Sequence, residues 1–249
     1  MNEPLAFSVK TPLLGPDTIV LTAMNGVPWW FFSGMPGSCA GLRLTSLDPD
    51  GTIAAAIPVA HVIGCVVHAS CKVPEPGVVA HVMGHGLIIG EPAGGVSPRV
   101  ANLASELDAA GFECQASERI QQDIWYKLWG NMTMNPISAF TGATVDRILD
   151  DDLARGYCLA MMKEAAAVGN AIGCPITQSG EDRIDVARKL GAFKTSMLQD
   201  VEAGKPLEID VLLTAVREIA GHVGIATPNL DALLGLTRVF ARTRGLYPS

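Results

Sequence analysis

The chain has 249 residues, of which 49% are hydrophobic, and it carries a formal net charge of −7 at pH 7. An acidic chain without a basic run is a poor candidate for binding nucleic acid. The length allows one large domain or two modest ones.

Two long segments, residues 18–42 and 51–71, contain no Asp, Glu, Lys or Arg. Glycine and proline interrupt both segments, as do Asn25, His61 and His68, so short buried strands explain them better than membrane spans. The first ten residues show no basic region followed by an apolar core, and no secretory signal is expected. We therefore expect a cytoplasmic protein without a membrane partner.

The first element expected in chain order is a strand over residues 18–23, which is uncharged and rich in β-branched residues. Such a run is typical of a central parallel strand covered on both faces. It is followed by Asn25 and Gly26, and ligands of open α/β sheets lie beyond the carboxyl ends of the strands. Asn25 is therefore a candidate ligand contact, although an Asn-Gly turn chosen for positive φ explains it equally well.

Residues 27–116 are expected to form more strands and one helix. The aromatic residues of the Gly/Pro-rich segment 27–42 could wall a pocket, form a subunit contact or pack in the core. Ser97 and Pro98 predict the start of a helix that ends before Gly111. The expected strands are residues 53–57, 59–68, 78–89 with a bend near Gly84 and Gly86, and 112–116.

Two motif-like clusters in this region are interpreted as structural. Residues 84–90 read GxGxxxG and are followed by Pro92, so they lack the spacing and the helix of a dinucleotide fingerprint; a hairpin or bulge is expected instead. His61, Cys65, His68 and Cys71 resemble a zinc site, but His68 would point to the opposite face of the strand. No metal site is expected, and the six scattered cysteines predict free thiols.

Residues 118–142 predict one long, mostly apolar helix. Lys127, Asn131 and Asn135 interrupt it at intervals of four residues, so one ammonium and two carboxamides share a helix face. Because asparagine is a poor helix former, two in register favour a substrate-facing line of donors over a solvated stripe. Pro136 predicts a kink or a break.

The rest of the chain predicts helices over residues 150–172, 179–190, 208–223 and 229–243. The change from β-branched strands to Ala/Leu/Met-rich helices predicts two domains, residues 1–117 and residues 118–249. Acidic and amide groups border a Gly-Lys-Pro turn in the segment SMLQDVEAGKPLEID, which begins at Ser196. Ser196 and Glu208 could complete a polar site with Lys127, Asn131 and Asn135, called the Lys127 line below, or they could be ordinary solvent-facing residues.

These motifs together resemble the ketopantoate reductase family. The resemblance runs from about residue 12 to residue 240, and its most specific parts are KLWGNMTMNP and SMLQDVEAGKPLEID. It implies an α/β plus all-α fold, in which a partial Rossmann-like sheet precedes a helical C-terminal domain and substrate binds in the cleft between them. It also implies NADPH-dependent reduction of a 2-keto acid, ketopantoate to pantoate, in pantothenate biosynthesis.

Family roles are carried over residue by residue. Lys127 matches the general acid, and an ammonium in a closed cleft would stabilise and then neutralise the developing alkoxide. Asn131, Asn135 and Ser196 match substrate contacts, Ser196 at the substrate carboxylate. Asn25 matches an asparagine that touches nicotinamide and substrate. Glu208 matches an acidic residue near the cofactor and the substrate hydroxyl.

Two departures from the family pattern stand out. Val145 occupies a position where the family has a further substrate-binding asparagine, which leaves other 2-keto acids open as substrates. The strand, GxGxxG turn and helix that begin the family's Rossmann domain, roughly 80 residues by resemblance, have no counterpart here. The remaining sheet is then expected to expose an edge, and the adenine half of NADPH lacks an identified site.

Three explanations follow for this departure. The chain could be a truncated gene product or the result of a start-site error, and its intact catalytic residues favour this explanation. It could be a non-catalytic binding or dimerisation remnant built on residues 118–249, which would form a homodimer. It could also recruit the missing half from another chain.

Overall fold

The computed structural model describes residues 13–189 and 191–248 of the chain. It divides into two compact units, Met1–Ile124 and Trp125–Ser249, which are described separately below. The predicted functional division at residue 117 remains a proposal.

The N-terminal unit is built on a four-stranded mixed sheet in the order β1-β2-β3-β4. β1 (Val20–Ala23) pairs in parallel with β2 (Val62–Glu75), β2 pairs antiparallel with β3 (Val78–Gly90), and β3 pairs in parallel with β4 (Glu113–Ser117). The predicted central position of residues 18–23 is wrong within the described residues, because β1 pairs only with β2 and three of its four residues are not buried.

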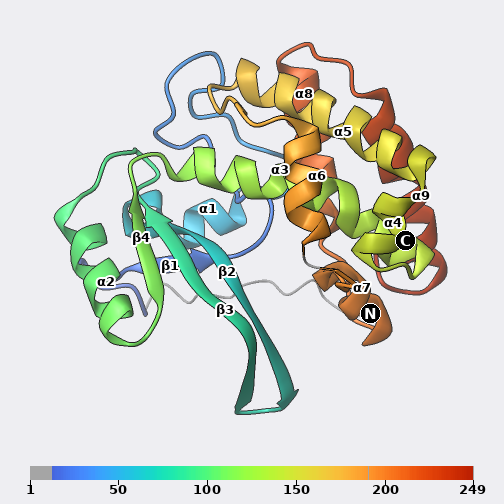
Figure 1. Cartoon of the computed structure of the whole chain (residues 1–249). Coiled ribbons are helices and arrows are strands. Elements are labelled where there is room, and N and C mark those ends of the chain that lie inside the picture. The colour runs from blue at the N-terminus through green and yellow to red at the C-terminus, as the bar shows by residue number, and fades with distance from the viewer. Residues whose placement is uncertain (1–12, 190, 249) are drawn as a thin grey trace. The chain divides into compact units, whose positions relative to one another are not determined.

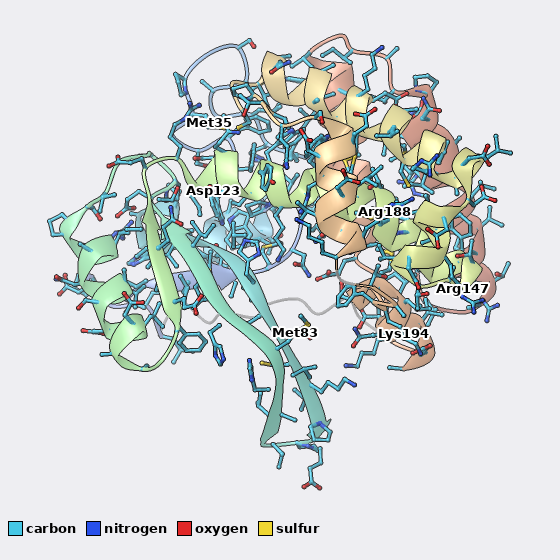
Figure 2. All side chains as sticks on the ribbon, in the orientation of Figure 1. Met35, Met83, Asp123, Arg147, Arg188 and Lys194 are labelled. Atoms are coloured by element: carbon cyan, nitrogen blue, oxygen red, sulfur yellow. The ribbon has the colours of Figure 1, made fainter. Side chains whose placement is uncertain are left out.

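The β2–β3 hairpin extends beyond both neighbouring strands as a two-stranded ribbon (Figure 1). Its register shifts between His68 and Ser70, and Gly84 adopts φ 72° at the irregularity. An added Cβ at Gly84 would lie 2.2 Å from the His68 carbonyl oxygen, so this close approach requires glycine. The predicted hairpin or bulge is therefore confirmed, and the outer ribbon carries exposed apolar residues that include Met83 (Figure 2).

Helix α2 (Pro98–Ala109) covers the sheet, with Val100 and Ala104 packed against Ile63 and Ile89. Ser97 caps it as predicted, by accepting a hydrogen bond from the Val100 amide. The aromatic segment belongs to the core: Trp30, Phe31 and Phe32 are fully buried. Trp30 also donates to Thr22 Oγ1 at 3.1 Å, which binds this segment to β1.

The predicted strand over residues 53–57 is wrong, because Thr52–Ala56 forms the short helix α1. Asp48 explains the difference. Its carboxylate accepts hydrogen bonds from the amides of Ile53 and Ala54, at 2.9 and 3.0 Å. This satisfies donors that a helix N-terminus leaves unpaired, and the three alanines that follow favour a helix. A short 3₁₀ turn, Val59–His61, then leads into β2.

Glu91, just after β3, links the sheet to the start of α2. Its carboxylate accepts from Arg99 Nε and Nη2 and from the Ser97 hydroxyl, and Arg99 in turn donates to the carbonyls of Ala60 and Val62. Hydrogen bonding to Arg99, the largest influence, holds the pKa of Glu91 below its ordinary value of 4.5.

Replacing Glu91 with glutamine is expected to lower the free energy of unfolding by about 1–2 kcal/mol at neutral pH. Because the folded-state pKa is depressed, this stabilisation is complete above the ordinary pKa and is lost as the pH falls through the folded-state value. Denaturant unfolding from neutral to acid pH would measure the difference between Glu91→Gln and the unsubstituted chain. A difference that stays constant through the acid range would contradict the account, and the exposed Glu106→Gln serves as control.

The C-terminal unit is helical. Helix α3 (Ile120–Thr141) begins in the N-terminal unit and continues into this one, followed by α4 (Val145–Asp150), α5 (Asp152–Ala171), α6 (Gly180–Arg188) and α7 (Ser196–Glu202). A π-helical turn, η3 (Asp210–Thr214), then leads into α8 (Ala215–His222), and α9 (Pro228–Thr243) follows. Helix α3 continues past Pro136, so the helix is not interrupted there.

Two tryptophans bind α3 to α5. Trp125 Nε1 donates to the Ala165 carbonyl at 3.2 Å, and Trp129 Nε1 donates to the Met162 carbonyl at 2.8 Å. Both indoles are buried, so each needs such a partner. This packing fixes the orientation of α3 about its own axis, and with it the direction of the Lys127 line.

Glu164 of α5 caps the N-terminus of α9. Its carboxylate accepts hydrogen bonds from the backbone amides of Asn229 and Leu230, both at 3.0 Å, and from the Asn229 carboxamide at 2.6 Å. A negative charge at this position also favours the helix dipole.

Replacing Glu164 with alanine is expected to destabilise the chain by about 2 kcal/mol, because two amides of α9 and the dipole lose their partner. Calorimetric unfolding would then show a Tm several degrees lower. The matched control is Asp185→Ala, at an exposed position of α6, which should leave the Tm nearly unchanged. Equal effects of both substitutions would refute the capping role.

Candidate active site

The polar line predicted from the sequence lies on helix α3. Lys127 and Asn131 are half-buried, and Asn135 is 7% exposed. Their flanks, including Leu128, Met132 and Trp129, are buried. Since the line falls on one continuous helix at intervals of four, the three side chains share a face. The face is therefore largely sheltered by protein, unlike a solvated stripe.

Among the described residues, the buried side-chain polar atoms without a hydrogen-bond partner include Arg183 Nε and Arg238 Nε, and the carboxamides of Asn131 and Asn135 are not among them. Lys127 takes part in an interaction within the chain. The polar line is therefore distinguished by its residue types, its spacing and its partial burial.

One side of this face is bordered by Arg183 of α6. Its guanidinium lies 5.3 Å from the centroid of the Tyr126 ring and packs over Gly130. Gly130 lies between Lys127 and Asn131 in the sequence. An added Cβ there would lie 2.9 Å from Arg183 Nη2, so the absence of a side chain leaves space for the guanidinium. No spacing in the sequence connects Arg183 with α3.

The other predicted residues of this unit lie on two neighbouring segments. Ser196 is the first residue of α7 and is exposed; the preceding Thr195 caps the helix by accepting from the Leu198 amide. Glu208 is also exposed, between the buried Leu207 and Ile209. Their roles remain predictions.

Asp200 of α7 belongs to the same electrostatic environment as Glu208. Burial, the largest influence, raises the pKa of Asp200, and the negative charge of Glu208 raises it further, while Lys205 lowers it. A charge interaction of this kind requires proximity. Asp200 is therefore sensitive to the charge of Glu208 on the other side of the Gly-Lys-Pro turn.

Asn25 belongs to the N-terminal unit. It lies two residues after the end of β1, is half-buried, and precedes Gly26, whose φ of 73° turns the chain. The predicted position at the carboxyl end of a parallel strand is confirmed. Its role as a ligand contact remains a prediction.

Val145 begins α4, where its amide donates to the Phe193 carbonyl at 3.0 Å and its side chain is 3% exposed. A buried valine cannot hydrogen-bond a substrate.

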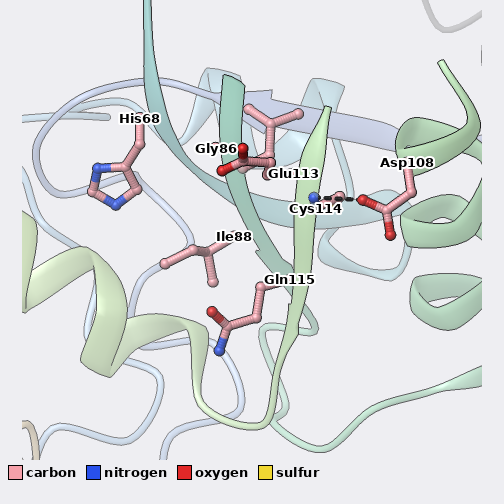
Figure 3. A pocket seen from close by; sticks show the side chains of 8 residues that line it. His68, Gly86, Ile88, Asp108, Glu113, Cys114 and Gln115 are labelled. Atoms are coloured by element: carbon pink, nitrogen blue, oxygen red, sulfur yellow. Dashed lines mark hydrogen bonds between the residues drawn. The ribbon is translucent and has the colours of Figure 1, made fainter. Parts of the chain in front are cut away.

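Two cavities, one in each unit, are lined by residues other than the predicted ones. A depression of about 520 Å³ lies at the β3–β4 end of the sheet and is lined by His68, Gly86, Leu87, Ile88, Asp108, Glu113, Cys114 and Gln115. Figure 3 shows His68, Ile88 and Gln115 around it, and the Cys114 amide donating to Asp108. Burial, with a contribution from Asp108, raises the pKa of the Cys114 thiol, so it is a poor nucleophile.

A second cavity of about 420 Å³ lies beside α5 in the C-terminal unit and includes Trp129 and Lys163 in its lining.

Across residues 13–189 and 191–248, no cluster of three or more His, Cys, Asp or Glu is arranged to hold a metal ion. All six cysteines are free thiols. In the same described ranges, every helix is too short or too polar to cross a bilayer.

Comparison with known proteins identifies the family. The family described as "Ketopantoate reductase PanE/ApbA C terminal" matches residues 119–241. The 2-dehydropantoate 2-reductase of Mesorhizobium japonicum is 45% identical over 236 residues, which are 95% of this chain and 72% of that protein.

Solved structures agree with this assignment. One from Ralstonia solanacearum, described as a ketopantoate reductase, is 60% identical with a TM-score of 0.92, covering 95% of this chain and 72% of that one. The 2-dehydropantoate 2-reductase of Methylococcus capsulatus is 31% identical with a TM-score of 0.73, covering 79% of this chain and 68% of that one. These neighbours confirm the predicted fold class, a partial Rossmann-like sheet followed by a helical domain. The chain therefore belongs to the ketopantoate reductase family of oxidoreductases.

Proposed function

We propose that this chain reduces a 2-keto acid, ketopantoate to pantoate, in the cytoplasm, with NADPH as the hydride donor and Lys127 as the proton donor. The observation that carries the proposal is the sheltered line of Lys127, Asn131 and Asn135 on α3 in a member of this family. An ammonium and two carboxamides on one helix face suit a substrate that carries a carbonyl and a carboxylate.

The residues present fit the nicotinamide end of the cofactor. The Asn25 carboxamide offers both a donor and an acceptor at the carboxyl end of β1, where open α/β sheets bind nucleotides. No GxGxxG sequence occurs in the 249 residues, so no residue is assigned to the pyrophosphate. When bound, NADPH supplies the hydride that adds to C2 of the keto acid.

The chain's own residues bind and orient the substrate and supply the proton. Asn131 and Asn135 hydrogen-bond the substrate, and the Ser196 hydroxyl donates to its carboxylate. As C2 gains the hydride, its oxygen becomes negative, and the Lys127 ammonium stabilises that charge and then transfers a proton to it. Glu208 accepts a hydrogen bond from the substrate hydroxyl and lies near the cofactor. The product is the 2-hydroxy acid.

Loss of NADPH absorbance in the presence of ketopantoate tests the proposal on the purified chain. A second substrate without the hydroxymethyl group, 2-oxoisovalerate, tests the hydroxyl contact proposed for Glu208, since the buried Val145 side chain offers no hydrogen bond. We expect kcat/KM to favour ketopantoate by more than about a hundredfold, because a site that hydrogen-bonds a hydroxyl rejects a substrate that lacks it. A smaller preference would mean that Glu208 does not bind the substrate hydroxyl.

The alternative is a non-catalytic binding or dimerisation module of the same family. Binding of ketopantoate without any consumption of NADPH would contradict the catalytic proposal and favour this alternative. The proposed homodimer is tested separately by the mass of the chain in solution. Turnover with ketopantoate would refute the hypothesis of a non-catalytic module.

A further inference from the structure

Two hydrogen bonds link the segment that carries Glu208 to Leu246 and Tyr247, near the end of the chain. The Leu207 amide donates to the Leu246 carbonyl at 2.9 Å, and the Tyr247 hydroxyl donates to Asp210 Oδ1 at 2.7 Å. These two hydrogen bonds bracket Glu208, one residue before it and two residues after it. The segment from Leu246 to Tyr247 is therefore a second support for a residue that the sequence separates from it by almost forty positions.

The local burial pattern makes this support effective. Leu207 is 6% exposed and Ile209 is fully buried, whereas Glu208 between them is exposed. In an extended or irregular segment, neighbouring side chains point in different directions, so anchoring residues 207 and 209 in the core sets the direction of residue 208. The position of Glu208 thus depends on how firmly Leu207 and Asp210 are held.

Asp210 also opens the π-helical turn η3, in which the Ala215 amide donates to the Asp210 carbonyl. Such turns are rare and frequently occur at functional sites. Here side chains support the wide turn: Thr214 Oγ1 donates to Asp210 Oδ1 at 2.8 Å, and Arg238 Nη2 donates to Thr214 Oγ1 at 3.0 Å. The Asp210 carboxylate therefore accepts hydrogen bonds from the hydroxyl of Thr214, within η3, and from the hydroxyl of Tyr247, near the chain end.

We propose that Tyr247 is a positioning residue for the active site: its hydrogen bond to Asp210 holds the η3 turn and thereby places the Glu208 carboxylate. The proposal rests on the function proposed above for Glu208. The Tyr247 hydroxyl acts through Asp210 and does not itself touch substrate. Since a displacement of about 1 Å can lower a rate by about a hundredfold, losing this bond should slow the reaction.

The test compares Tyr247→Phe with a matched control, Tyr157→Phe. Tyr157 lies on α5 of the same unit, and its hydroxyl also makes one hydrogen bond, to the Asn229 carbonyl at 2.5 Å. Burial raises the pKa of both tyrosines, so both hydroxyls are protonated donors at neutral pH. Tyr247→Phe removes the hydrogen bond to Asp210 and the interaction of the hydroxyl with Arg238. Tyr157→Phe removes the hydrogen bond to Asn229, which does not support the Glu208 segment.

Amide hydrogen exchange over residues 207–214 is the first measurement, because it needs neither substrate nor cofactor. We expect exchange at least about fivefold faster in Tyr247→Phe and unchanged in Tyr157→Phe, in line with loss of local protection. Asp210→Asn keeps an acceptor oxygen and should retain most of the protection that Asp210→Ala loses. Unchanged exchange in Tyr247→Phe would overturn the proposal.

Steady-state kinetics with NADPH and ketopantoate is the second measurement. Tyr247→Phe should lower kcat about tenfold with a smaller change in KM, and Tyr157→Phe should change kcat less than about twofold. Faster exchange with an unaltered kcat would overturn the positioning role. If the unsubstituted chain shows no turnover, the proposed function fails, and the exchange result alone then supports or overturns the link between Tyr247 and the Glu208 segment.

Discussion

Replacing Lys127 with alanine is expected to lower kcat for NADPH-dependent keto-acid reduction about a thousandfold. The ammonium is proposed to stabilise the developing alkoxide and to supply its proton, and general acid catalysis typically contributes 10²–10⁴-fold. Because Lys127 is half-buried on α3, its charge acts in an environment less polar than water. Steady-state rates with ketopantoate measure the effect, and circular dichroism verifies that the variant folds.

The matched control for this substitution is Lys163→Ala. Lys163 is an exposed lysine of the neighbouring helix α5, outside the proposed site. Its loss should change kcat less than about twofold, as expected of a surface position. Comparable losses in both variants, or full activity in Lys127→Ala, would rule out Lys127 as the proton donor.

Replacing Gly169 with alanine is expected to cause a large loss of stability. An added Cβ would lie 2.4 Å from Trp125 Nε1 and 2.6 Å from the Cys174 carbonyl oxygen. The indole cannot move away without weakening its hydrogen bond to the Ala165 carbonyl. Overpacking and the weakened bond together predict a loss of about 3 kcal/mol in the free energy of unfolding, measured by denaturant titration.

Helix α5 contains its own control for this experiment. Gly156 lies on the same helix but is exposed, and an added Cβ there meets no atom within 4 Å. Gly156→Ala should therefore stabilise the chain, by up to about 1 kcal/mol, because alanine favours a helix. If both substitutions change the free energy of unfolding in the same direction, the close contacts of Gly169 do not explain why glycine is needed there.

Elements with strong local signals were predicted well from the sequence. Ser97 and Gly111 delimit α2, and the glycines near residue 84 form the bulge, because both features depend on nearby residues. Residues 53–57 were wrongly predicted as a strand, because the Asp48 carboxylate that caps them comes from outside the segment. The short helices α4 and α7 were not predicted, since neither has more than two turns of periodic pattern.

The residues of the candidate site also differ in whether a local sequence pattern indicates them. The Lys127 line could be found because three polar residues share the period of one helix. The fold places the chain end beside Asp210 through a contact between segments that are far apart in the sequence. No periodicity connects Tyr247 or Arg183 with these partners, so only the packing of helices could indicate them. Tertiary contacts of this kind leave no local trace in a single sequence.

The most direct test of the central claim is a nuclear magnetic resonance titration of the ¹⁵N-labelled chain with ketopantoate. The account predicts that the side-chain amide signals of Asn131 and Asn135 shift on binding. The Asn229 carboxamide, already bound by Glu164, should not shift. Shifts confined to the His68–Gln115 depression, or no shift of the α3 carboxamides at saturating ligand, would contradict the claim that this helix face binds the 2-keto acid.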